Sequence, residues 1–148
     1  MSARALGVIV TGGRHYVLSV DDFLLIEGTM RAVGAKTICT DGSAGVADQV
    51  GAWAERRGVP VLKVTANWMR EGPATPEERN TSLVELARTV IAFPGEGPTD
   101  DLLSKARRRR LRIVESPGRL AALRPALERP ILNLTPGPRQ RSGPSPRV

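Results

Sequence analysis

The sequence predicts an α/β protein in which a parallel β-sheet is covered by helices on both faces. Five short runs rich in Val and Ile recur along the chain, and their weak alternation is typical of strands buried on both faces. Segments with helical spacing separate these runs, and that order calls for right-handed crossovers between parallel strands. We therefore expect a Rossmann-like sheet of about five strands in the order 3-2-1-4-5.

The expected strands are short apolar segments at 6–10, 36–40, 60–64, 89–93 and 111–115. Cys39, the only cysteine, falls in the second of them. We interpret it as a buried strand residue, and a single cysteine excludes an intrachain disulfide.

Four helices are expected between the strands. Ser19 is a suitable N-cap for "VDDFLLIEGTMRAV", and Gly34 is a suitable stop. Trp53 recurs with helical spacing along "VADQVGAWAERR" and is expected in the core. Pro76 and Pro98 can each open a helix at its first position, in "PEERNTSLVELA" and "PTDDLLSKARRRR".

The length and composition favour one domain with a tail. A chain of 148 residues can bury one core of ordinary size. We expect the Rossmann-like domain at 1–118, a short helical or extended segment at 119–133, and a disordered tail rich in Pro, Gly and Arg at 134–148. The formal charge is +7, of which the residues from Arg119 onward contribute +5.

No apolar run approaches the roughly 20 residues that are needed to cross a bilayer. The apolar segment near the N-terminus is too short for the hydrophobic region of a signal peptide. We therefore expect a cytoplasmic protein without membrane contact. Nothing in the sequence predicts a metal site or a separate cofactor. Aromatic residues are only 3% of the chain, which weakens any model in which bases stack on an aromatic platform.

The loop after the first strand is the first candidate for ligand binding. It reads "TGGR", from Thr11 through Gly12 and Gly13 to Arg14. Two glycines allow a tight turn and a close approach of the backbone to a ligand. The alternative is a plain turn between a strand and a helix.

The loop after the second strand has a similar composition. Gly42, Ser43 and Gly45 precede a helix, whose free N–H groups and positive dipole end favour an anion. In the strand order 3-2-1-4-5, the first and fourth strands are neighbours where the winding reverses, so the loops that follow them, at 11–14 and 94–99, are expected to meet at the ligand crevice.

The loop after the fourth strand, "PGEGPT", is the third candidate. It contributes Pro94, Gly95, Glu96, Gly97 and Thr99. Its glycines expose the backbone, but Pro98 removes one N–H group and the Glu96 carboxylate repels an anion. We expect ribose-like hydroxyls or a weak phosphate contact here.

A long loop and the helix after it could complete the site. Arg79 could clamp a phosphate or stabilise a transition state, and Asn80 is its neighbour. An exposed Arg79 paired with Glu78 or Glu85 is the alternative. Trp68, in the long loop, is the better of the two tryptophans for stacking on a base.

Four segments of the chain resemble the SLOG superfamily, in particular its small stand-alone YspA-like members. The segments are "TGGRHY", the Gly-containing loop before "VADQVGAWAERRGVPV", the "ANW" to "RN" region, and "VIAFPGEGPTDDLL", and the resemblance covers 6–115. It implies a nucleotide or nucleotide-derived ligand, such as a nucleoside phosphate or ADP-ribose. It also implies distant kinship to the LOG phosphoribohydrolases, which cleave an N-glycosidic bond.

The resemblance assigns roles to several residues. It implies ligand contacts at the three glycine-bearing loops and at Asn80, and a catalytic role for Arg79 and Asp101 if the ligand is hydrolysed. The phosphoribohydrolases carry Pro-Gly-Gly-x-Gly-Thr-x-x-Glu, whereas this chain has Leu102 at the position of the glutamate. Asp101 is the nearest substitute for that missing acid.

A different class of function is also open. The basic run at 105–112 and the arginine-rich tail favour a nucleic-acid-associated protein, although a solvated helix face gives the same pattern. Binding of a small nucleotide-derived ligand, with or without hydrolysis, remains the first prediction. The sequence does not decide between a monomer and a homo-oligomer.

Overall fold

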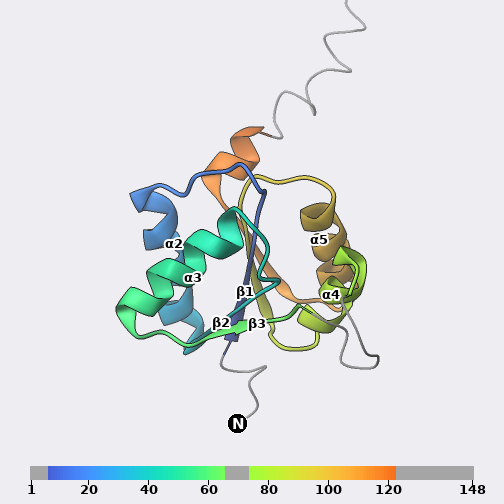
Figure 1. Ribbon diagram of the computed structural model, residues 1–148, viewed down its shortest axis with the longest axis horizontal. Coiled ribbons are helices and arrows are strands. Elements are labelled where there is room, and N and C mark those ends of the chain that lie inside the picture. Colours follow the sequence, from blue (N-terminus) through green and yellow to red (C-terminus); the bar gives the residue numbers. More distant parts are fainter. Residues whose placement is uncertain (1–6, 66–73, 123–148) are drawn as a thin grey trace, which may run out of the picture.

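The structure, a computed structural model, describes residues 7–65 and 74–122 (Figure 1). Strands and helices alternate along the chain, as predicted. The elements are β1 (Gly7–Thr11), α2 (Val20–Val33), β2 (Thr37–Thr40), α3 (Val46–Arg57), β3 (Val61–Lys63), α4 (Pro76–Leu83), β4 (Thr89–Ala92), α5 (Pro98–Arg108) and β5 (Arg112–Glu115).

The sheet has five parallel strands in the order β3-β2-β1-β4-β5, which confirms the predicted topology. Ile9 of β1 pairs with Cys39 of β2 on one side and with Val90 of β4 on the other. β1 and β4 are adjacent at the point where the strand order reverses. In sheets of this kind that is where a crevice opens beyond the carboxyl ends of the strands.

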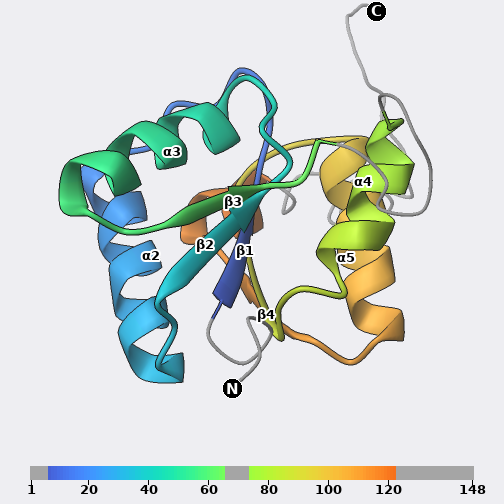
Figure 2. The same ribbon diagram turned by 60° about the horizontal axis from the view of Figure 1, so that its bottom comes forward.

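Helices cover both faces of the sheet (Figure 2). Val8 and Val10 of β1 pack into the cluster that contains α2 and α3, whereas Ile9 packs into the cluster of α4 and α5. Successive side chains of a strand point to opposite faces, so the continuous apolar runs of β1 and β4 supply two cores at once. Cys39 and Trp53 are both buried, as predicted.

Residue patterns predicted where α2 and α3 begin and end. Ser19 forms a capping box with Asp22 at the start of α2, and Gly34 ends the helix in the left-handed conformation. α3 ends in the same way at Gly58.

The other two helices are shorter than their patterns suggested. α4 ends at Leu83 rather than Ala87, because the amides of Glu85 and Leu86 bond three residues back and form tight turns that lead into β4. α5 ends at Arg108, and Arg110 leaves the helical conformation with φ 60°.

The chain continues after β5 into helical residues at 117–122. Trp68 and the expected tail at 134–148 lie outside the residues that the structure describes. Within the described ranges, none of the helices has the length and apolar character to cross a bilayer.

Candidate ligand-binding site

A cavity of about 830 Å³ opens at the carboxyl end of the sheet, within the range typical of small-molecule sites. It lies where β1 and β4 end side by side, the place predicted from the topology. The described residues that line it are Thr11, Gly12, Gly13, Arg14, His15, Tyr16, Asp41, Ser43, Ala44, Pro76, Arg79, Pro94, Gly95, Glu96, Gly97, Pro98, Thr99, Arg119 and Ala122.

The loops after β1 and β4 pack backbone against backbone. The amide of Gly13 donates to the carbonyl of Pro94 at 2.7 Å. A Cβ added at Gly95 would come within 2.7 Å of both the Gly13 amide nitrogen and the Thr99 hydroxyl oxygen. Thr99 is also within hydrogen-bond distance of the Thr11 hydroxyl, at 3.3 Å. Glycine at position 95 is therefore required by the contact between the loops, whether or not a ligand is bound.

Gly45 joins the start of α3 to the same loops. The amide of Val46, the first residue of α3, donates to the Gly13 carbonyl at 3.2 Å. Gly45 has φ 93°, and a Cβ there would overlap the backbone of Gly13 and Arg14. No side chain would fit this position. Three strand-end loops are thus held together by direct backbone contacts.

The two helices that begin at these loops have no side-chain N-cap. α2 and α4, in contrast, have complete capping boxes from Ser19 and Thr75. At α5 the amide of Thr99 is already bonded to the Glu96 carbonyl at 2.8 Å, and Pro98 has no N–H group. The start of α5 therefore offers few donors, in line with the weak phosphate contact expected there.

The loop after β2 contributes a fixed polar pair. The Asp41 carboxylate accepts from the amide of Ser43 at 2.9 Å and from its hydroxyl at 2.7 Å. Both residues line the cavity. Gly42 lies against Thr65 and Lys63 instead, and neither it nor Gly45 is part of the lining. These two glycines shape the loop, and Ser43 is the predicted residue that reaches the cavity.

Three arginines line the cavity from three parts of the fold. Arg14 is exposed on the β1 loop, and Arg79 is half-buried at the start of α4. One guanidinium nitrogen of Arg79 donates to the Ala74 carbonyl at 3.2 Å, whereas its buried Nε has no hydrogen-bond partner in the part of the chain that is described. A buried donor without a partner is costly.

Arg119 was not predicted as a site residue. It is only 5% exposed and lies between Glu115, at 2.8 Å from its Nε, and Asp100, at 3.3 Å from a terminal nitrogen. The signal in the sequence was Ser116 followed by Pro117 directly after the fifth strand, which marks a new helix start at the same edge of the sheet. The Ser116 hydroxyl accepts from the Arg119 amide at 3.0 Å.

Tyr16 was also not predicted. Its ring lines the cavity and stacks on Phe93 with a centroid distance of 6.2 Å. Its hydroxyl donates to Asp22 at 2.6 Å, and this hydrogen bond, with burial and the Asp22 charge, raises the pKa of Tyr16 to about 12. Gln49 of α3 holds the loop on both sides, since it accepts from the Leu18 amide and donates to the Tyr16 carbonyl.

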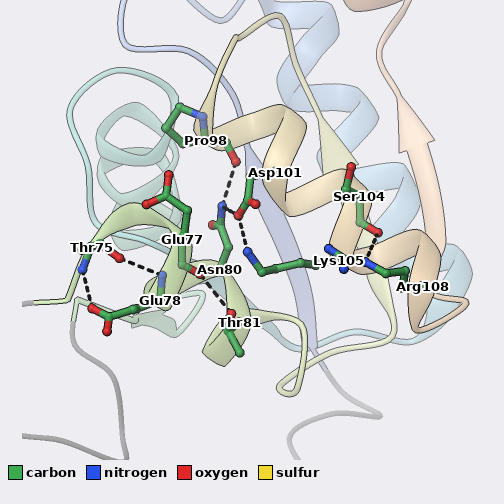
Figure 3. Close-up of polar contacts among 10 residues, drawn as sticks. All are labelled: Thr75, Glu77, Glu78, Asn80, Thr81, Pro98, Asp101, Ser104, Lys105 and Arg108. Atoms are coloured by element: carbon green, nitrogen blue, oxygen red, sulfur yellow. Dashed lines mark hydrogen bonds and ion pairs between the residues drawn. The ribbon is translucent and has the colours of Figure 1, made fainter.

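Asn80 and Asp101 do not line the cavity. They join α4 to α5, as Figure 3 shows: the Asn80 amide donates to the Pro98 carbonyl at 2.8 Å and to Asp101 at 3.0 Å, and Lys105 donates to Asp101 at 2.6 Å. Burial raises the pKa of the Asp101 carboxyl, but the hydrogen bonds from Lys105 and Asn80 outweigh it and lower the pKa below its usual value.

Leu102, which the resemblance aligns with the glutamate of the phosphoribohydrolases, is 1% exposed and packs in the core with α4 and β4. The structure therefore brings Ser43, Arg79 and the predicted residues of the loops after β1 and β4 to one cavity. Gly42, Gly45, Asn80 and Asp101 are not part of its lining.

Fold and cavity together define a Rossmann-like α/β protein with a pocket at the carboxyl edge of its sheet. Comparison with protein-family models, curated proteins and solved structures finds no match to this chain. The resemblance to the SLOG superfamily therefore stays a prediction.

Proposed function

We propose that the protein binds a nucleotide-derived ligand, a nucleoside phosphate or an ADP-ribose-like molecule, in the cavity. The observation that carries the proposal is the convergence of three arginines on a pocket built from three strand-end loops. A planar guanidinium binds a phosphate or a carboxylate group with two parallel hydrogen bonds.

The rest of the lining suits the sugar and base of such a ligand. Asp41 and Glu96 are acceptors for hydroxyl groups. Glu96 is exposed, and both carboxylates would repel a phosphate placed against them. A ligand with one anionic end and one end rich in hydroxyls matches this division.

The proposal is for binding, and we assign no hydrolytic step to Asp101. Its carboxylate is held by Lys105 and Asn80 and lies outside the cavity lining. A general base must be within hydrogen-bond reach of the proton that it removes, and the described geometry does not give Asp101 that reach.

A thermal-shift panel with nucleoside monophosphates, nucleoside diphosphates and ADP-ribose tests the proposal. A true ligand at about 100 times its Kd adds about 2.7 kcal/mol to the free energy of unfolding, and so raises Tm. Arg14→Gln should reduce that shift, because Arg14 is exposed and lines the cavity. Arg31→Gln, the same charge change at the last turn of α2, is the matched control and should keep the shift. An equal loss in both variants, or no shift with any nucleotide, would overturn the proposal.

A further inference from the structure

The end of the sheet opposite the cavity carries a concentration of exposed cations. All five strands are parallel, so their amino ends share one edge, where the preceding helices end. On the side of α2 and α3 this edge holds Arg31, Lys36, Arg56 and Arg57. On the side of α5 and β5 it holds Arg88, Arg107, Arg108, Arg109, Arg110 and Arg112. We call these residues the basic end.

Few carboxylates neutralise the basic end. In the described ranges, Glu27, Glu55 and Glu85 are within four residues of it along the chain. Glu115 is as near to Arg112 in sequence, but it is at the carboxyl end of β5. Arg57 pairs with Glu27 at 2.6 Å, and Arg109 pairs with Glu85 at 3.1 Å. Within that part of the chain, the other cations of the basic end form no ion pair. The result is a surface with a large uncompensated positive charge.

Helix dipoles account for only part of this arrangement. Cations in the last turn of a helix stabilise it, which explains Arg31, Arg56, Arg57, Arg107 and Arg108. Arg88 and Arg112 have no such role. They lie next to each other at the starts of β4 and β5, where the Arg112 amide donates to the Arg88 carbonyl at 2.8 Å. Both side chains are exposed, and neither forms an ion pair within the described residues.

The composition of the basic end favours nucleic acid over a membrane surface. A peripheral membrane site combines cations with exposed apolar side chains that enter the lipid. The large apolar residues that are exposed in the described chain are Val17, Val20, Leu24 and Leu120, and none belongs to the basic end. All but one of the cations there are arginines, which bind phosphates bidentately.

We propose that the basic end binds the phosphate backbone of nucleic acid without reading its sequence. The described aromatic side chains near it are not available to stack on bases, since Trp53 is buried beneath Arg57 and against Phe23. Affinity then comes from charge, so it falls steeply with salt. This inference does not rest on the proposed function of the cavity.

The basic end is far from the point where the described chain ends, before the arginine-rich tail. The last described residue, Ala122, lines the cavity, at the opposite end of the sheet. The basic run and the arginine-rich tail can therefore be tested separately for binding to nucleic acid.

The test is fluorescence anisotropy of a labelled DNA duplex of mixed sequence, titrated with the full chain between about 50 and 200 mM salt. One variant is R88Q/R107Q/R112Q, which changes three exposed arginines that have no ion pair in the described part. The matched control is R139Q/R141Q/R147Q, which removes the same charge from the tail. Thermal melting of each variant shows whether it is folded.

The proposal predicts that the basic-end variant raises Kd by about tenfold or more, and lowers the steepness of log Kd against log salt by about 3. The tail variant should bind nearly as the parent chain does. The reverse pattern would assign binding to the tail and overturn the inference. So would the absence of duplex binding by the parent chain, or preferential binding to vesicles of anionic phospholipid.

Discussion

The two ends of the sheet differ in how their charges are used. At the cavity end, α2, α3, α4 and α5 each begin with Asp or Glu in the first turn. Several of these carboxylates have fixed partners: Asp22 closes a capping box, and Asp100 and Asp101 are paired with Arg119 and Lys105. At the basic end, most of the described cations have no carboxylate partner.

This difference separates two kinds of binding. The cavity end presents a few donors and acceptors in fixed positions, and its arginines act at short range against a background of acidic residues. The basic end presents many exposed guanidinium groups on long side chains. Salt should therefore weaken a polyanion at the basic end much more than a small ligand in the cavity.

The largest expected effect on stability comes from the loop packing at the cavity end. Gly45→Ala places a Cβ against the backbone of Gly13 and Arg14 at φ 93°. We expect a loss of about 2–4 kcal/mol in the free energy of unfolding. Gly28→Ala in α2 is the control, because nothing lies within 4 Å of its added Cβ. It should gain about 0.5–1 kcal/mol from helix propensity. Urea denaturation measures both, and similar values for the two would disprove the loop packing.

Removing Arg119 should come next. Arg119→Met leaves Glu115 and Asp100 without their partner, but Asp100 is largely exposed. A loss of about 1–2 kcal/mol is expected, together with weaker binding of the cavity ligand. Arg112→Met, at an exposed position of the basic end, should change stability by about 0.5 kcal/mol or less. Calorimetry of unfolding and of ligand binding would detect both effects.

The hydrogen bonds of Asp101 with Asn80 and Lys105, which join α4 to α5, predict that the free energy of unfolding depends on pH. The pKa of the Asp101 carboxyl is below its ordinary value of 3.8 in the folded protein. Its contribution to stability is thus present above the unfolded pKa and is lost as pH falls through the folded pKa. The difference in unfolding free energy between the parent chain and Asp101→Asn should be largest near neutral pH and should shrink in acid. A difference that does not change with pH would contradict this ionised pair.

The smallest effect on stability is expected at the basic end. The variant R88Q/R107Q/R112Q removes exposed charges that form no ion pair in the described residues, so its Tm in the absence of ligand should stay close to that of the parent chain. Its response to cavity ligands should also be preserved. A large fall in Tm would show that these arginines support the fold.

The order of strands and helices could be predicted because the spacing of apolar residues agrees with the residues that begin the helices. The ends of α4 and α5 were predicted too late in the chain. Ser19, Gly34, Pro76 and Pro98 each mark a helix end that the structure confirms. The topology then placed the three glycine-bearing loops at one edge. Local pattern was sufficient here because each element follows its own sequence signals.

The site was harder to predict because side-chain direction depends on packing between elements. Successive helix residues are turned by about 100° from each other. Asp100 reaches Arg119, whereas Asp101 faces Asn80 of α4 and Leu102 enters the core. The sequence alone could not show which way each of these three side chains points. Nor could it show that Gly45 and Gly95 are needed for contacts between loops.

The most direct test of the cavity as a ligand site is native mass spectrometry of the full chain with phosphorylated nucleotides and their parent nucleosides. We predict a 1:1 complex with at least one phosphorylated ligand and much less with its nucleoside. The complex should weaken in Arg14→Gln/Arg79→Gln and persist in R88Q/R107Q/R112Q. Equal occupancy by nucleotide and nucleoside, or loss of the complex only in the basic-end variant, would contradict the account.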